Sequence, residues 1–248
     1  MRILFAVLIA SLALVSGANA EVYNWTGYYI GANAGYGWGD SDVSTTASAG
    51  TYFAPSSVAA VNAAGHGKVH PDGFVGGVQA GMNWQNGNLV LGGEVDFNAY
   101  DLSKSRTITA VYPAFAPDTF TLGQSVKADW LLTLRPRVGI AMDNLLGYVT
   151  GGLAVTNLKN TNSFSDTFGL GATEYGSGSK TKYGWTLGAG VEYALMDNWS
   201  AKLEYLYTDF GSVSSSGTLT AAGPSAAPFS HSADLTSSTL RLGVNYKF

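Results

Sequence analysis

Two histidines in this chain stand at a spacing that can hold a metal ion or a heme iron. His66 and His70 flank the segment 67–69. An H-x3-H pair shares one metal when a helix or a fixed loop turns both imidazole rings to the same side. Gly65 and Pro71 disfavour a helix across this segment. We therefore expect a solvated loop with no metal bound, and we keep His66 and His70 as the candidate ligand-binding residues.

Charged residues form a second set with possible chemistry, because they recur at alternate positions of segments that are otherwise apolar. Five acids and four bases belong to it: Glu94, Asp96, Asp129, Arg135, Arg137, Glu192, Lys202, Glu204 and Arg241. The charges nearly cancel, and charges in a poorly hydrated interior need partners. We expect a structural network of salt bridges that fills an interior and fixes strand register. A gated narrow channel lined by the same residues is the alternative.

Covalent and cofactor chemistry find no specific support. The chain has no cysteine, which excludes a disulfide scaffold, a thiol nucleophile and an iron–sulfur site. The spacing reveals no Ser-His-Asp arrangement, and neither of the segments 35–37 and 169–171 is followed by a helix that would make it a dinucleotide loop. The net charge is −4 and the basic residues are dispersed, so a nucleic-acid partner is not expected. We predict no catalytic residue, no cofactor and no enzyme.

The elements that position the charges are predicted to be β-strands. Only 12% of the residues are charged, about half the usual share, and 32 of the 248 are glycine. Large apolar side chains alternate with small or polar ones, which is the period of a strand with two different faces. Seven segments show this alternation clearly: 28–38, 74–84, 89–99, 130–138, 183–193, 199–207 and 238–248.

An eighth strand, about 146–158, is less regular. Tyr148 and Thr150 are expected on one face, with Val149 and Gly151 on the other. Pro136 lies inside the strand 130–138 and removes one ladder donor. We therefore expect a local bulge at Pro136.

The composition of the two faces indicates which one touches lipid. The polar face is largely glycine, which is unfavourable in a strand unless space is tight, as it is inside a small barrel. The apolar face must then lie outside, with aromatic side chains near both strand ends. The aromatic residues near strand ends are Tyr28, Trp38, Trp84, Phe97, Trp130, Trp185, Tyr193, Trp199, Tyr207 and Phe248. The alternative is that these aromatics form the core of a water-soluble fold.

The connections alternate between short and long. Asn86-Gly87 lies in a tight hairpin turn between two of the strands, and two more short turns are centred on Asp143 and Asp197. The links 39–72, 101–125, 159–181 and 211–234 are long and rich in small polar residues. This alternation is typical of short periplasmic turns and longer external loops.

The first twenty residues have the pattern of an export signal. A basic start is followed by an apolar run that is too short to span a bilayer as a helix and by Ala18-Asn19-Ala20. We predict a signal peptide at 1–20 that is cleaved after Ala20. Residues 21–248 are expected to form one barrel domain.

Three segments carry a family resemblance. They are Trp25-Thr26-Gly27-Tyr28-Tyr29-Ile30-Gly31, Tyr148-Val149-Thr150-Gly151-Gly152-Leu153-Ala154 and Leu240-Arg241-Leu242-Gly243-Val244-Asn245-Tyr246-Lys247-Phe248. The chain resembles the small outer-membrane β-barrel surface antigens of alphaproteobacteria, a porin-like group related to the opacity proteins. The resemblance implies insertion by the outer-membrane assembly machinery, with Tyr246 and Phe248 as the assembly signal. Some relatives are described as heme-binding, but no heme motif is carried over to residues of this chain.

The sequence thus predicts an all-β fold, an eight-stranded antiparallel transmembrane β-barrel that forms an up-and-down meander closed by its N- and C-terminal strands. We expect a structural, surface-exposed protein of the antigen or adhesion type in the outer membrane of a Gram-negative bacterium. Its lumen would be plugged by side chains, and it would carry four long external loops. The alternatives are a narrow small-solute porin and a heme- or ligand-binding surface protein. Expected partners are outer-membrane lipid and lipopolysaccharide, the assembly machinery, and host or ligand molecules at the loops.

Overall fold

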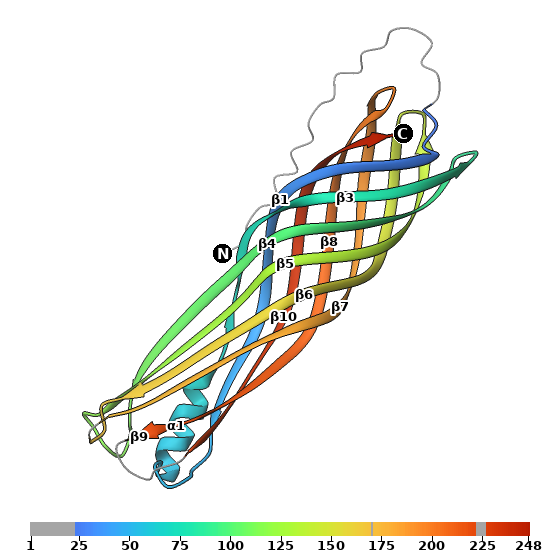
Figure 1. The fold of residues 1–248 in the computed structure, drawn as a ribbon. Helices are drawn as coiled ribbons and strands as arrows, with labels where there is room; N and C mark the ends of the chain where they lie inside the picture. Colours follow the sequence, from blue (N-terminus) through green and yellow to red (C-terminus); the bar gives the residue numbers. More distant parts are fainter. Residues whose placement is uncertain (1–22, 170, 222–226) are drawn as a thin grey trace.

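The computed structural model describes residues 23–169, 171–221 and 227–248, which form ten strands and one helix (Figure 1). Their bounds are β1 Gly27–Ala47, α1 Pro55–Gly65, β2 His66–Val69, β3 Asp72–Asn86, β4 Leu89–Val111, β5 Thr119–Met142, β6 Leu145–Asp166, β7 Ala172–Met196, β8 Trp199–Thr218, β9 Thr220–Ala221 and β10 Pro228–Lys247. The predicted signal peptide, 1–20, lies outside the described residues, so its cleavage stays a prediction.

Eight long strands form one closed antiparallel sheet. Each long strand pairs with the next along the chain, and β10 returns to pair with β1 from Lys247–Tyr29 to Phe229–Ala47. The short strands β2 and β9 are additions that pair with β1 and β7. The predicted eight-stranded meander closed by the N- and C-terminal strands is confirmed. No helix in the described part of the chain is long and apolar enough to cross a membrane.

The strands are much longer than the sequence pattern suggested. Seven of the eight long strands have 20–25 residues, whereas a membrane-spanning strand needs about 9–11. Of the links predicted as four long loops, 101–125, 159–181 and 211–234 are mostly strand, whereas 39–72 holds the end of β1, helix α1 and strand β2. This part of the prediction is wrong, because small polar residues were interpreted as loop although they continue the strand alternation.

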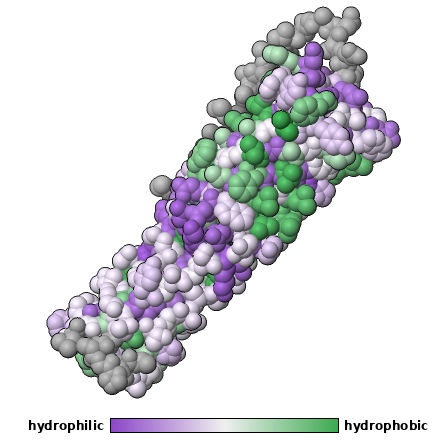
Figure 2. Space-filling model, in the orientation of Figure 1, coloured by the Kyte–Doolittle hydropathy of each residue, from purple (hydrophilic) through white to green (hydrophobic). Residues whose placement is uncertain are grey.

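The apolar side of the strands changes from the outside to the inside along the barrel. On β5, Leu134 is 59% exposed, whereas Leu122, twelve residues earlier, is 1% exposed. On β1, Ile30 is exposed and Val43 is buried. Figure 2 shows the outward apolar side chains as a green band over one part of the molecule, next to a purple and white remainder. The barrel therefore has a lipid-facing part and an outer part with a polar exterior and an apolar core.

The outer part has a core of its own. One apolar cluster includes Val43, Leu102 and Leu158, and a second, nearer the tip, includes Phe164 and Phe229. Helix α1 begins with a proline, which suits a helical first position, and inserts Val61 into the second cluster. The helix therefore helps to close the end of the barrel that lies far from the start of β1 and the end of β10 (Figure 1).

The outer part opens into two sheets along two seams. Among the described residues, the β7–β8 ladder ends at the pair Trp185–Asp209, and the β3–β4 ladder ends at Asp72–Ser103. Beyond these pairs, β4 to β7 form one sheet, which β9 joins at the tip, and β1, β2, β8 and β10 form the other. The two sheets enclose the apolar clusters between them.

Cations cross both seams in place of ladder hydrogen bonds. At one seam, Lys104 Nζ lies 3.4 Å from Asp72 Oδ1, and Arg106 Nη1 donates to the carbonyl oxygen of His66 at 3.1 Å. At the other, Lys180 Nζ and Lys182 Nζ donate to carbonyl oxygens of β8. Cationic side chains of this kind protect strand edges from pairing with other chains.

Strand β5 contains a bulge, but not at Pro136. Its register with β6 shifts between Ala128 and Leu131. Across Pro136 the register is the same before and after, although the pairs of Arg135 and Pro136 with β6 are missing. The expected bulge at Pro136 is therefore wrong. Because Thr150 Oγ1 donates to the Pro136 carbonyl oxygen at 2.9 Å, the strand stays attached without a register change.

Candidate functional site

Eight of the nine charged residues predicted for the lumen lie together inside the barrel, and we call them the charged layer. They are Glu94, Asp96, Arg135, Arg137, Glu192, Lys202, Glu204 and Arg241. None is more than 4% exposed. Four carboxylates face four cations, so their formal charges cancel.

Arg135 on β5 lies at the centre of this layer. Its Nη2 donates to Glu94 Oε1 at 2.6 Å and to Asp96 Oδ2 at 2.7 Å, and its Nη1 donates to Glu204 Oε2 at 3.2 Å. Arg241 on β10 donates from Nε to the same Glu204 oxygen at 2.8 Å and from Nη2 to Asp96 Oδ2 at 3.1 Å. Two arginines from strands that lie four places apart in the closed sheet, β5 and β10, thus bind the same carboxylates across the lumen.

Two further cations complete the layer. Lys202 Nζ lies 2.8 Å from Glu94 Oε2, and Arg137 Nη1 lies 3.2 Å from Glu192 Oε2. Each cation therefore has a carboxylate within salt-bridge distance, as groups removed from water require.

Two tyrosines that were not selected from the sequence belong to the layer. Tyr29 donates to Glu94 Oε2 and Tyr148 donates to Glu204 Oε1, each at 2.8 Å. The Arg137 guanidinium lies 4.8 and 5.1 Å from the centres of these two rings. Tyr29 and Tyr148 both stand on the small or polar face of their strands, and that placement was the available signal.

Glycines provide the space that these tyrosines occupy. A Cβ atom at Gly81 would lie 2.3 Å from the Tyr29 hydroxyl oxygen, and one at Gly190 would lie 2.6 Å from that of Tyr148. Both contacts are far shorter than van der Waals distance. The glycine-rich inner face thus follows from the crowding of large side chains in a narrow lumen.

The charged layer has the chemistry of a plug. Its groups are partnered with one another and hidden from solvent, so none is presented to a substrate from outside. An eight-stranded barrel leaves a lumen just wide enough for side chains, and here those side chains are long and ion-paired. The geometry supports a filled lumen better than a conducting one.

Asp129, the ninth predicted lumen residue, lies on the outer surface, and its predicted placement is wrong. Its carboxylate oxygens lie 2.6 Å from Lys159 Nζ and 3.1 Å from Lys127 Nζ. The bulge between Ala128 and Leu131 inserts one residue and reverses the facing of the strand on its far side. Strict alternation from Arg135 placed Asp129 inside because a bulge has no clear sequence signal here.

The two candidate ligand histidines do not converge. His66 Nε2 lies 3.2 Å from Ser44 Oγ and its Nδ1 lies 2.6 Å from the carbonyl oxygen of Asn62. His70 Nδ1 lies 2.6 Å from Asp40 Oδ1. Each imidazole thus has partners of its own, which the other does not share. Among the described residues, no group of three or more His, Cys, Asp or Glu side chains could hold a metal.

The two residues expected to signal assembly lie at the end of β10. The Tyr246 ring packs 5.1 Å from that of Trp199, and Phe248 is 69% exposed on the outside. The Phe248 amide donates to the Tyr28 carbonyl oxygen at 2.9 Å. The last residues of the chain therefore close the barrel against its first strand.

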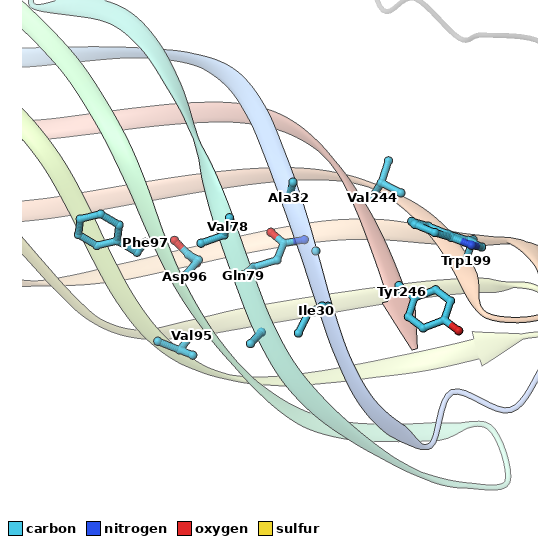
Figure 3. A pocket seen from close by; sticks show the side chains of 12 residues that line it. Ile30, Ala32, Val78, Gln79, Val95, Asp96, Phe97, Trp199, Val244 and Tyr246 are labelled. Carbon is cyan, nitrogen blue, oxygen red and sulfur yellow. The ribbon is translucent and has the colours of Figure 1, made fainter. Parts of the chain in front are cut away.

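A hollow of about 590 Å³ lies on the lipid-facing surface of the same strands (Figure 3). Phe97 stands at one end and Trp199 with Tyr246 at the other, and Ala32 and Val78 line it between them. It lies within the apolar outer band and is separated from the lumen by the sheet. We assign it to contact with lipid.

A cluster of two tyrosines and an aspartate at the outer tip was also not predicted from the sequence. The hydroxyls of Tyr52 and Tyr112 both donate to Asp166 Oδ2 at 2.9 Å. These residues come from three separate connections or strand ends, so no local spacing brings them together. The available signal was that aromatic residues such as Phe164 and Phe168 occur in a segment that was interpreted as a polar loop.

Comparison with known proteins places the chain among exported barrels. Residues 7–248 match the family model described as the outer membrane protein beta-barrel domain. The chain is 36% identical to the 31 kDa outer-membrane immunogenic protein of Brucella melitensis over 98% of its length and 91% of the relative's. It is 28% identical to the 22 kDa outer membrane protein of Rhizobium leguminosarum over 86% and 87% of the two chains.

Solved structures with a similar course of the chain have low sequence identity. Neisserial surface protein A is 14% identical, with a TM-score of 0.37 over 90% of this chain and 98% of that one. The outer membrane protease OmpT of Escherichia coli is 9% identical, with a TM-score of 0.46 over 93% and 100% of the two chains.

Proposed function

The chain belongs to the outer-membrane β-barrel protein family, and on this premise we propose that it works as a closed anchor that displays a rigid two-sheet body outside the cell. It is a surface antigen-type protein of the Gram-negative outer membrane. In the proposal the lipid-facing part of the barrel transmits no solute, and the outer part supplies the contact surface. The proposed role is mechanical and interfacial, without catalysis.

The observation that carries the proposal is the charged layer. Arg135, Arg241 and their carboxylates span the lumen with side chains at most 4% exposed. Opening a water path would separate these ion pairs, and breaking a buried pair is costly. A barrel with this interior is suited to anchoring rather than transport.

Single-channel recording on the purified protein in a planar bilayer tests the closed barrel. We expect no stable conductance from the unaltered protein. The variant Arg135→Ala removes the side chain that bridges three carboxylates, so we expect conducting events to appear in it. Lys127→Ala, which alters an exposed lysine on the same strand, serves as the matched control. A stable conductance of the unaltered protein would favour a narrow porin instead.

In the proposal, the expected lipid partner contacts a lysine pair on the outer surface. Lys127 and Lys159 are directly opposite one another on β5 and β6, close to Trp130 at the outer edge of the apolar band. Like charges at such a pair repel unless anions lie near them, and Asp129 is the carboxylate between them. In the proposal, phosphate groups of lipopolysaccharide also bind these two lysines, next to the Asp129 carboxylate.

The expected assembly partner fits the other end of the barrel. Tyr246 and Phe248 lie outside at the closing strand. In the proposal they are recognised by the assembly machinery before β10 pairs with β1. A shortened variant that lacks Phe248 is expected to accumulate unfolded, whereas Phe168→Leu at the tip is expected to assemble normally.

A further inference from the structure

An aromatic pocket opens at the outer tip of the barrel, beside the start of α1. Its cavity measures about 80 Å³. Its lining comes from the segment before α1 and the first turn of α1, from the β4–β5 turn, and from the end of β6 with the residues after it: Tyr52, Phe53, Ala54, Ser57, Tyr112, Phe115, Asp166 and Phe168. Five of these eight side chains are aromatic rings, and one is a carboxylate.

The rings are held at angles to one another. The Phe115 and Phe168 rings are 4.9 Å apart and inclined by 62°. The Tyr52 and Phe168 rings are 6.4 Å apart and nearly perpendicular, at 88°. Phe168 remains 37% exposed, so the pocket is accessible from outside. Rings set at such angles present more than one face or edge to the same small space.

A carboxylate with neutral partners stands in the wall. Tyr52 and Tyr112 donate their hydroxyl hydrogens to Asp166, and the Ala172 amide donates to it at 2.8 Å. Within the described ranges, no Lys, Arg or His nitrogen lies within salt-bridge distance of Asp166. The donors fix the position of the carboxylate but leave its negative charge uncompensated.

We propose that this pocket binds the quaternary ammonium group of an organic cation. Ring faces attract cations through their quadrupole, and aromatic cages are the usual way in which proteins recognise quaternary ammonium groups. The cavity of about 80 Å³ has room for a compact group only. That volume suits a compact methylated ammonium and excludes a porphyrin, so this site is separate from any heme site.

The inference rests on the proposed function in one respect only: the proposed function places the tip of the barrel, and so the pocket, outside the cell. Binding to purified protein in detergent micelles does not depend on orientation or on a closed lumen. A conducting barrel would therefore contradict the proposed anchor but not the proposed binding pocket. An absence of choline binding would contradict the pocket but not the anchor.

Calorimetric titration with choline and with 3,3-dimethylbutan-1-ol tests the proposal. The alcohol has the same shape but carries no charge. We expect saturable binding of choline and about tenfold weaker binding of the alcohol, since cation–π and carboxylate attraction act on the cation alone. Equal affinity for both would overturn the proposal, as would the absence of saturable choline binding.

Variants locate the site. Phe115→Leu removes a ring that makes no side-chain hydrogen bond, and Asp166→Asn removes the charge while keeping an acceptor. Each is expected to weaken choline binding about tenfold, whereas Tyr175→Leu, on the outer face of β7, is expected to leave it unchanged. Folding of each variant is checked by comparing the migration of heated and unheated samples on a gel. Unaltered choline affinity in folded Phe115→Leu and Asp166→Asn would refute the assignment.

A final arm distinguishes the source of the cation. Vesicles of phosphatidylcholine are compared with vesicles of phosphatidylglycerol for capture of protein in micelles. Capture by the first only, reduced by Phe115→Leu, indicates a lipid headgroup. Choline binding without vesicle capture indicates a free small cation. Vesicle capture that Phe115→Leu does not change contradicts a role of the pocket at membranes.

Discussion

At the scale of single residues, the ion pairs in the lumen carry the largest energetic consequence. Arg135 contacts three carboxylates, and all four side chains are at most 2% exposed. Removal of one partner from a buried ion pair leaves uncompensated charge and typically costs about 3–5 kcal/mol. We expect Arg135→Met to lower the free energy of unfolding by an amount in this range.

Urea titration of the folded fraction in micelles measures this change. Lys127→Met is the matched control on the same strand, because its ion pairs with Asp101 and Asp129 are exposed and such pairs contribute little. Equal unfolding midpoints for Arg135→Met and Lys127→Met would contradict the structural role of the charged layer.

The tip tyrosines make the second residue-scale prediction, which concerns pH. Burial raises the pKa of Tyr52 and of Tyr112, and the hydrogen bonds to the Asp166 carboxylate raise both further. Because the folded-state pKa is raised, the neutral phenols stabilise the tip at every pH below the ordinary tyrosine pKa of about 10. That contribution is lost as the pH rises through the raised value.

Phenolate absorbance is recorded as a function of pH for the unaltered protein and for Tyr52→Phe and Tyr112→Phe. Subtracting the curve of each variant from that of the unaltered protein gives the titration of the tyrosine that the variant lacks. We expect Tyr52 and Tyr112 to ionise well above pH 10 in the unaltered protein. In Asp166→Asn, which lacks the carboxylate charge, we expect both to ionise at a lower pH. A difference signal that appears at about pH 10 in the unaltered protein would contradict the buried tyrosine–carboxylate cluster.

Residue-level prediction from the sequence succeeded where alternation was regular. It placed Glu94, Arg135 and Arg241 on the inner face because the strand period is two. It failed at Asp129, where a bulge inserts one residue. It also could not bring Tyr52 to Asp166, since that contact joins residues 114 positions apart.

At the scale of elements, the two seams of the outer part need explanation. Strand β4 is an edge strand beyond Ser103, and β7 is one from Gly184 back to Glu174, before β9 pairs with it. Exposed edges invite pairing with other chains. Lys180 and Lys182 reach from β7 to carbonyl oxygens of β8 across one seam. They therefore occupy the acceptors that a foreign strand would need.

Replacement of both seam lysines tests this role. We expect Lys180→Met combined with Lys182→Met to fold normally but to associate at lower protein concentration, because the edge loses its charges. Sedimentation velocity in micelles measures the association. Lys159→Met, which alters a lysine on the face of the same sheet, is the control and is expected to stay monodisperse. Indistinguishable sedimentation of the double variant and the control would refute edge protection.

The strand bounds were predicted accurately for the membrane part of the barrel and poorly for the outer part. Glycine, serine and threonine between 159 and 181 were interpreted as loop, although Asn160, Asn162 and Phe164 continue the inward alternation of β6. The strand period persists there, but its apolar side has moved inward. A search for alternation alone, without a fixed apolar side, would have extended the strands.

At the scale of the whole molecule, one set of strands borders both lipid and water. The membrane part has its apolar side chains outside and its charges inside, and the outer part has its apolar clusters inside and most of its charged side chains outside. Each arrangement satisfies its own surroundings, since lipid accepts apolar surface and water accepts polar surface. A long barrel can therefore project a folded surface away from the membrane without a separate domain.

The exchange of sides along β5 is the central claim, and cysteine labelling tests it most directly because the chain has no cysteine of its own. Three single variants are compared on intact cells: Lys127→Cys, Leu134→Cys and Leu122→Cys. A membrane-impermeant maleimide is expected to label only Lys127→Cys, and a lipid-soluble thiol reagent in the bilayer is expected to reach Leu134→Cys but not Leu122→Cys. Labelling of Leu134→Cys by the impermeant reagent, or of Leu122→Cys by either reagent, would contradict a barrel whose apolar side turns inward beyond the membrane.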